Sequence, residues 1–250
     1  MNRTIYTVAS GGMASLARLE AVSQNLANAN TAGYKAGRLV FQVRPLSRED
    51  DPSGISLDPV LGRTAAQVAE VASVRDFAQG AVRSSGNPLD VAISGEGFFA
   101  VATPRGERYT RQGSFALDGE GYLVTQHGER VQGDGGDIAV GGGDIAIGDD
   151  GSITSDGLAV GRIKVVSFGP KPALVPEGAA LFAPMRGVVG TPIDAASVRL
   201  QPAAIEASNV DAVASMVELV EVSRGFESYM RAMQRLDEVA QRSINEVGKV

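Results

Sequence analysis

Residues 219–236 read LVEVSRGFESYMRAMQRL, and their apolar positions alternate between spacings of three and four. This heptad pattern is typical of a helix that packs lengthwise on other helices. Ser208 and Asn209 are natural N-cap candidates, and a helix over residues 209–250 would be about 60 Å long at ~1.5 Å per residue. Because that exceeds the width of a small domain, we expect the stripe to meet a partner outside the β region. A helix that covers the chain's own sheet is the alternative. The stripe consists of Leu219, Val222, Phe226, Tyr229, Met233 and Leu236.

The first 30 residues predict a second, shorter amphipathic helix with one narrow apolar stripe. The Gly11–Gly12 pair interrupts this helix and weakens it by about 1 kcal/mol per glycine relative to alanine. A stripe this narrow cannot hold an isolated helix, so we expect the segment to become ordered only on a partner surface. The main apolar positions are Met13, Leu16, Leu19 and Leu26.

Between the two helices, short β-like segments alternate with glycine-rich turns such as Asp118-Gly119-Glu120-Gly121. Short strands with a turn about every ten residues indicate an antiparallel sandwich or open barrel. The predicted class is therefore α+β, with terminal helices pairing into a coiled-coil-like domain around a central antiparallel all-β domain. The expected division is a helical assembly domain over 1–35 and 206–250, an extended arm over 36–78, and a β-rich outer domain over 79–205. Pro45, Pro52 and Pro59 favour the extended arm, which we expect to pack on a neighbour.

Composition excludes several classes of function. The formal charge is −6, which argues against nucleic acid as a partner because phosphate binding needs clustered Lys and Arg. The chain has no cysteine and one histidine, so thiolate zinc sites and multi-histidine metal sites within one chain are ruled out. No stretch approaches the ~18 apolar residues of a membrane span, and the first residues lack the apolar core of a secretory signal peptide.

The sequence also lacks enzyme motifs. It contains no P-loop and no G-x-S-x-G elbow, so we expect neither an enzyme nor a cofactor, and we name no catalytic, cofactor-binding or metal-binding residue. Two other classes stay open. One is an adhesin-like all-β binding module with helical ends. The other is a β-sandwich glycosidase, which would need a deep cleft with two carboxylates roughly 5–9 Å apart.

Four motifs in order along the chain carry a family resemblance. Residues 25–35, NLANANTAGYK, closely resemble the N-terminal signature of bacterial flagellar rod and hook proteins. Residues 86–99, GNPLDVAISGEGFF, and 109–115, YTRQGSF, look like the middle motifs of that family, and residues 208–227 look like its terminal helix. The chain is thus similar to the flagellar basal-body rod proteins. Its length and its opening residues look most like the proximal-rod members, with the distal-rod members as the close alternative.

The resemblance implies a structural, non-enzymatic subunit of the rod. Its partners would be copies of itself, other flagellar rod proteins and the flagellar type III export apparatus. It would be exported without a cleaved signal peptide and would stack helically in the periplasmic space, where the rod transmits torque from the motor to the hook. The terminal helices would form the inner tube of that rod.

The residues expected at the assembly interface come from both ends of the chain. We expect the three asparagines among them to form hydrogen bonds between subunits, with simple helix capping as the alternative. We also expect Leu219→Asp or Phe226→Asp to abolish assembly while the β domain stays folded. The interface residues are Met13, Leu16, Leu19, Asn25, Leu26, Asn28, Asn30, Thr31, Gly33, Tyr34, Leu219, Val222, Phe226, Tyr229, Met233 and Leu236.

Overall fold

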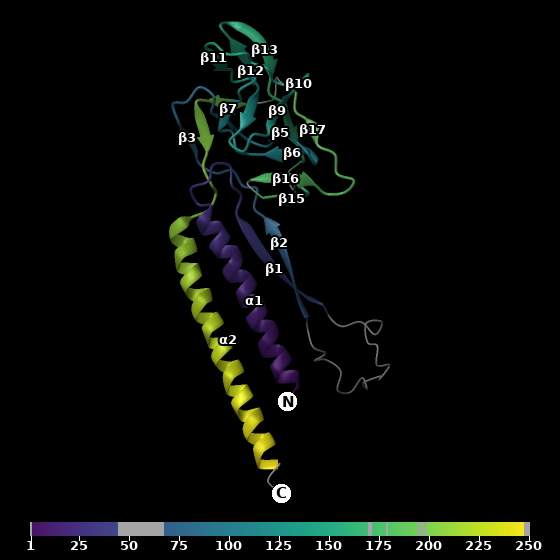
Figure 1. Cartoon of the computed structure of the whole chain (residues 1–250), viewed down its shortest axis with the longest axis vertical. Coiled ribbons are helices and arrows are strands. Elements are labelled where there is room, and N and C mark those ends of the chain that lie inside the picture. The colour runs from purple at the N-terminus through teal and green to yellow at the C-terminus, as the bar shows by residue number, and fades with distance from the viewer. Residues whose placement is uncertain are drawn as a thin grey trace. The chain divides into compact units, whose positions relative to one another are not determined.

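The computed structural model describes residues 2–44, 68–169, 172–178, 180–194, 197 and 199–247. The chain divides by its contacts into two compact units. The helical unit comprises residues 1–27, 37–76 and 211–250, and the β unit comprises residues 28–36 and 77–210. The predicted α+β class is confirmed, since two terminal helices flank a central antiparallel β region (Figure 1).

In the helical unit, α1 (Asn2–Ala27) and α2 (Ala212–Val247) lie side by side and run antiparallel (Figure 1). The α1 helix passes through Gly11 and Gly12 without a break, because packing on a neighbouring helix can offset the low helix propensity of glycine. Coiled-coil pairing of the two helices stays a prediction.

The same unit contains a two-stranded ribbon in the segment that the sequence indicated as an extended arm. β1 (Gly37–Arg44) pairs antiparallel with β2 (Val68–Arg75), with Gly37 opposite Arg75 and Arg44 opposite Val68. The three prolines that favoured an arm lie outside the described residues. Packing of this segment on a neighbouring molecule stays a prediction.

The cap of α2 differs from the expected one. The backbone N–H groups of Val213 and Ala214 donate to Asp211 Oδ1 at 2.9 and 3.0 Å, so Asp211 is the N-cap residue. Ser208 Oγ instead accepts from the N–H of Val210, and Asn209 donates to the carbonyl oxygen of Ala78. Both predicted caps therefore lie ahead of the helix, in the β unit.

In the described residues, the β unit is built from short strands whose pairings are all antiparallel. The main sheet has the order β15-β16-β6-β5-β9-β8-β7, with β10 on β9, β14 on β5 and β17 on β14. A three-stranded sheet, β11-β12-β13, adjoins it in the same unit. The strands are β3 (Val82–Ser84), β4 (Val91–Ile93), β5 (Phe98–Thr103), β6 (Gly106–Thr110), β7 (Phe115–Leu117), β8 (Leu123–Thr125), β9 (Arg130–Gly133), β10 (Gly136–Asp137), β11 (Ile145–Ile147), β12 (Ser152–Ser155), β13 (Leu158–Arg162), β14 (Val165–Ser167), β15 (Leu174–Pro176), β16 (Leu181–Pro184), β17 (Thr191–Pro192), β18 (Leu200–Pro202) and β19 (Ala204–Glu206).

The central strand β5 is buried on both faces. Successive strand residues point to opposite faces, so Phe99 and Val101 enter an aliphatic core while Phe98 and Ala100 enter an aromatic one. In the aromatic core, the Phe98 ring lies edge-on to Phe77, Phe168 and Phe182. This double core explains why β5 reads as a continuous apolar run in the sequence.

The last strands return to the first ones. β18 pairs with β4, and β19 pairs with β3. The segment that enters the β unit after α1 (residues 28–36, the incoming segment) therefore meets the segment that leaves it (residues 203–210, the outgoing segment). A backbone hydrogen bond of 2.8 Å from the N–H of Gly33 to the carbonyl oxygen of Glu206 joins the two segments.

Candidate assembly interface

The α1 and α2 helices approach closely where α1 carries glycine. A Cβ atom on Gly11 would lie 2.8 Å from the Tyr229 ring, so this approach requires the absence of a side chain. About two helical turns further along α1, Arg18 Nη2 lies 2.7 Å from Glu218 Oε1 in an exposed ion pair. These two contacts fix the antiparallel register of the helix pair.

The predicted C-terminal stripe lies on the face of α2 that Tyr229 occupies. Val222 stands seven residues before Tyr229, so it shares that face, and it is only 7% exposed. The other members, apart from the exposed Tyr229, are half-buried. The stripe is therefore covered in large part within the subunit, and a role between subunits for these residues stays a prediction. The half-buried members are Leu219, Phe226, Met233 and Leu236.

On α1, the residues of the predicted stripe separate into two groups. Leu19 and Leu26 are half-buried beside Val22, which is 5% exposed and which the sequence analysis did not single out. Met13 and Leu16 are exposed at 73% and 41%. The same spacing would have found Val22, because it stands three residues after Leu19 and four before Leu26.

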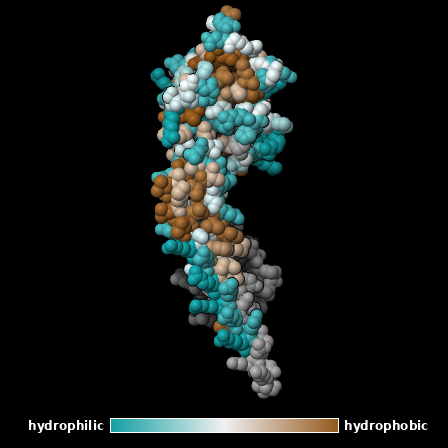
Figure 2. Space-filling view, turned by 60° about the vertical axis from the view of Figure 1, so that its left-hand side comes forward, coloured by the Kyte–Doolittle hydropathy of each residue, from teal (hydrophilic) through white to brown (hydrophobic). Residues whose placement is uncertain are grey.

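A second apolar surface lies on the first turns of α2, on the side opposite Val222. Its members stand at spacings of three, one and three, which places them on one face at 100° per residue. Figure 2 shows the hydrophobic surface on the upper part of the helical unit. We call it the apolar patch. It consists of Val213, Met216, Val217 and Val220, exposed by 72%, 53%, 57% and 51%.

The same face of α2 becomes charged after Val220. Arg224, Glu227 and Arg231 continue it, and Arg231 Nη2 lies 3.1 Å from Glu227 Oε2 in an i,i+4 pair. The apolar part is thus confined to the N-terminal turns of the helix. A monomeric helix gains nothing from four exposed apolar side chains in two turns, and such patches commonly mark interaction sites.

Two of the three asparagines of the 25–35 motif have partners within the subunit. The Asn25 side chain donates to the carbonyl oxygen of Gly37 and accepts from its N–H, both at 2.8 Å, and so holds β1 to the end of α1. Asn28 Oδ1 accepts from Thr31 Oγ1 at 3.2 Å, whereas Asn30 is exposed. The predicted bonds between subunits stay untested for all three asparagines.

The end of the same motif is buried in the β unit. Gly33 has φ +68°, and a Cβ atom there would lie 2.4 Å from backbone atoms of Arg111 and Gln112. Tyr34 is also buried. These two predicted interface residues therefore fix the incoming segment inside the subunit.

Three buried charged side chains, which the sequence analysis did not identify, lie beside that segment. Lys35 Nζ is 2.6 Å from Glu206 Oε1, and Arg111 Nη1 is 3.2 Å from Glu206 Oε2. The three side chains are 0%, 5% and 1% exposed for Lys35, Arg111 and Glu206. Burial lowers the pKa of the Arg111 guanidinium, and the neighbouring Glu206 opposes that shift. We call Lys35, Arg111 and Glu206 the charge cluster.

Three models of known families match the chain, in an order that follows its architecture. Residues 5–35 match "Flagella basal body rod protein". Residues 92–155 match "Flagellar hook protein FlgE/F/G D1 domain", and residues 201–246 match "Flagellar basal body rod FlgEFG protein C-terminal". These three matches include both helices and the centre of the β unit.

A flagellar basal-body rod protein FlgF from Caulobacter vibrioides is 32% identical over 258 residues, which cover 100% of both chains. This chain belongs to the flagellar basal-body rod protein family. FlgF of Escherichia coli is 32% identical over 97% of both chains. FlgG of Caulobacter vibrioides is also 32% identical, over 96% of this chain and 97% of its own.

The prediction of a structural rod-family protein most like FlgF is thereby confirmed, with the FlgG paralogue as the alternative. The rod-family motif 25–35 joins both units, since Asn25 holds the ribbon and Lys35 enters the charge cluster. A signal for the cluster existed in the sequence, because Lys35, Arg111 and the 206–210 region lie in or beside three of the four motifs. The sequence alone could not show that Lys35 and Arg111 both pair with Glu206.

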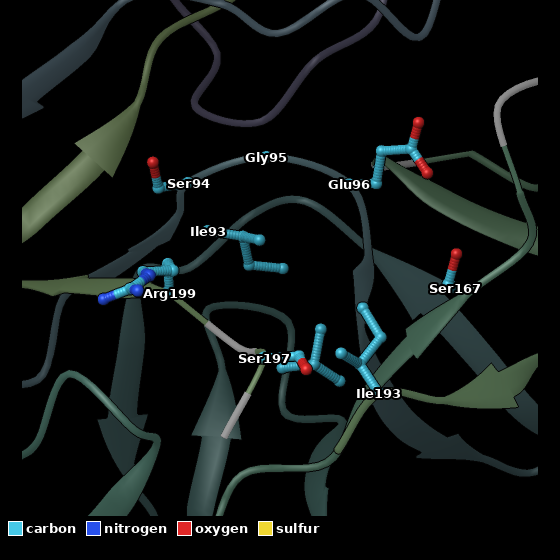
Figure 3. Close-up of a pocket in the computed structure, with 9 residues that line it drawn as sticks. Ile93, Ser94, Gly95, Glu96, Ser167, Ile193, Ser197 and Arg199 are labelled. Atoms are coloured by element: carbon cyan, nitrogen blue, oxygen red, sulfur yellow. The ribbon is translucent and has the colours of Figure 1, made fainter. Parts of the chain in front are cut away.

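A surface pocket of about 470 Å³ lies at the end of β4 in the β unit of this rod-family chain. Its apolar lining residues are Ile93, Val165 and Ile193, and Figure 3 shows Glu96 and Arg199 at opposite sides of it. Glu96 is the one carboxylate among the lining residues. A glycosidase needs two carboxylates across its cleft, so this pocket does not offer the geometry of that alternative.

The described part of the chain contains neither a candidate metal cluster nor a helix able to cross a membrane. Within it, no three His, Asp or Glu side chains are grouped so that they could hold a metal ion. Nor does any described helix have the length and apolar character needed to cross a membrane.

Proposed function

We propose that this chain is a non-enzymatic subunit of the proximal rod, which assembles helically with copies of itself and with other rod proteins. The rod lies in the periplasmic space and transmits torque from the motor to the hook. The subunit reaches it through the flagellar type III export apparatus without a cleaved signal peptide. The full-length match to FlgF supports the proximal position, and the FlgG paralogue of the distal rod is the second candidate.

The apolar patch is the observation that carries the proposal. The face of α2 that contains Val222 is already covered within the subunit, whereas the opposite face presents Val213, Met216 and Val217 to solvent. Burying apolar area gives roughly 25 cal/mol per Å², so covering the patch with a neighbouring subunit would be favourable. A contact between unlike surfaces whose rotation does not close into a ring generates a helical array when it is repeated.

The burial of the heptad stripe changes the choice of mutations that can test assembly. Leu219 and Phe226 are half-buried, so an aspartate at either position would disturb the helix pair itself and would not isolate a contact between subunits. Val217 is the better choice because its side chain is mostly exposed in the single subunit. Val239 is a matched control, since it is a valine of the same helix with a similar exposure of 56%.

The test compares Val217→Asp with Val239→Asp in cells that lack the unaltered chain. We expect Val217→Asp to leave the helix content of the purified chain unchanged and to remove the protein from isolated basal bodies, with loss of swimming. Val239→Asp should remain in the basal body. Equal incorporation of the two variants, or equal loss, would show that the apolar patch is not the assembly contact.

A further inference from the structure

The incoming segment is held by residues that come far later in the chain. Besides the bond from Gly33 to Glu206, the N–H of Ala36 donates to Asn209 Oδ1 at 2.8 Å. The N–H of Asn209 in turn donates to the carbonyl oxygen of Tyr34 at 3.4 Å. The incoming segment therefore closes onto the outgoing segment and not onto its neighbours in sequence.

Glu206 is the centre of the buried contacts at this junction. Its Oε1 accepts from Lys35 Nζ at 2.6 Å and from the N–H of Gly80 at 2.9 Å, while its Oε2 faces Arg111 Nη1 at 3.2 Å. Lys35 also donates to the carbonyl oxygen of Ala78, and Arg111 donates to that of Gly95, both at 2.8 Å. One carboxylate thus connects four separate segments.

The charge cluster consists of two cations, Lys35 and Arg111, and one anion, Glu206, so its three side chains carry a net positive charge. Without Glu206, Lys35 and Arg111 would be two buried positive charges that have lost the carboxylate both contact, and breaking a buried ion pair by removing one partner is strongly unfavourable. Without Lys35, the remaining Arg111–Glu206 pair would be neutral. Glu206 lies 171 residues after Lys35 and 95 after Arg111, so it is the last of the three to be made.

We propose that Glu206 makes closure of the β unit conditional on the outgoing segment. Residues 31–36 and 78–80 stay open until β19 pairs with β3 and brings the carboxylate to the two cations. On a chain in which β19 has not yet paired with β3, residues 31–36 therefore stay undocked from the β unit. It concerns the folding of the single subunit, so it does not depend on the apolar patch or on assembly.

An ion cluster that only adds general stability would behave differently. Its loss would weaken the whole β unit, including β5 and β9. A conditional closure predicts a local effect instead, confined to the incoming segment and to residues 78–80. It also predicts an order among variants, because Glu206→Gln removes the carboxylate that both cations contact, whereas Lys35→Met leaves the Arg111–Glu206 pair intact.

The test is amide hydrogen exchange of the full-length chain followed by mass spectrometry. In Glu206→Gln, peptides over 31–36 and 78–80 should exchange about a hundredfold faster or more, while peptides over β5 and β9 keep their protection. Lys35→Met should give a clearly smaller effect. Glu218→Gln is the control, because it breaks the exposed pair with Arg18 and should leave the β unit unchanged.

Three results would overturn the proposal. They are unchanged exchange over 31–36 in Glu206→Gln, equal acceleration over β5 and β9, and an effect of Lys35→Met as large as that of Glu206→Gln. If Glu206→Gln does not fold, pulse-labelled refolding of the unaltered chain decides. The amide of Ala207 reports the docking of the outgoing segment, because it donates to the carbonyl oxygen of Ala81. The amides of Gly33 and Ala36 should gain protection together with Ala207 or after it. Protection of Gly33 and Ala36 before Ala207 would contradict the proposal.

Discussion

Gly33 shows how one residue of the N-terminal motif serves the fold. Its φ of +68° is a left-handed conformation that L-residues with a side chain rarely adopt, and the Arg111 backbone leaves no space for a Cβ atom. The glycine therefore allows the incoming segment to lie directly against the turn that carries Arg111. Because Lys35 follows two residues later, this close approach also brings its side chain to the charge cluster.

Substituting this glycine should be costly for two separate reasons. Gly33→Ala should lower the free energy of unfolding of the β unit by about 2–5 kcal/mol, since strain in the backbone adds to a collision with backbone atoms. Gly86→Ala is the matched control, because Gly86 has φ +76° with no atom within 4 Å of an added Cβ. It should cost only the backbone strain, about 1–2 kcal/mol.

Urea unfolding followed by near-ultraviolet circular dichroism measures both variants. Equal losses for Gly33→Ala and Gly86→Ala would mean that the collision with the Arg111 backbone has no energetic weight.

At the scale of the elements, the α1–α2 pair contains two glycines in different surroundings. An added Cβ on Gly11 would meet the Tyr229 ring, whereas one on Gly225 would meet nothing within 4 Å. Gly225→Ala should therefore stabilise the helical unit by about 0.5–1 kcal/mol through helix propensity alone. Gly11→Ala should gain less or lose stability, because the tyrosine ring must move away.

Thermal unfolding of the two variants, followed by far-ultraviolet circular dichroism, tests this difference. A gain for Gly11→Ala as large as that for Gly225→Ala would show that the close approach at Tyr229 does not contribute to the pairing.

The elements also show what the sequence can predict. The heptad stripe of α2 and the short strands of the central region were predicted because period and length are local signals. The ribbon β1–β2 was not predicted, although Leu39, Phe41 and Val43 occupy every second position in GRLVFQVR. The prolines that follow in the sequence drew the interpretation towards an extended arm.

The site was harder to predict than the fold. A lysine is rarely fully buried, and Lys35 finds its counter-charge 171 residues later, so no local pattern could pair them. Likewise, a heptad stripe shows that a helix packs on something, but it does not say whether that partner belongs to the same chain. In the structure, α1 packs on the heptad stripe of α2. The apolar patch could be identified only from the exposed fractions of its side chains.

For the whole molecule, these observations separate two tasks. The charge cluster and β19 close the β unit upon itself, and the face of α2 that carries Val222 pairs the helices. The helical unit also exposes an apolar patch on the first turns of α2, formed by Val213, Met216, Val217 and Val220. We propose that this surface serves assembly and that the buried contacts serve folding.

The most direct test of that assignment uses the absence of cysteine from the chain. A single cysteine in Val217→Cys should react with a maleimide in the free subunit and be protected in isolated basal bodies. Val222→Cys is the control, since its buried position should stay unreactive in both states. Equal labelling of Val217→Cys in the free subunit and in the basal body would contradict the claim that the apolar patch is the surface through which this chain assembles.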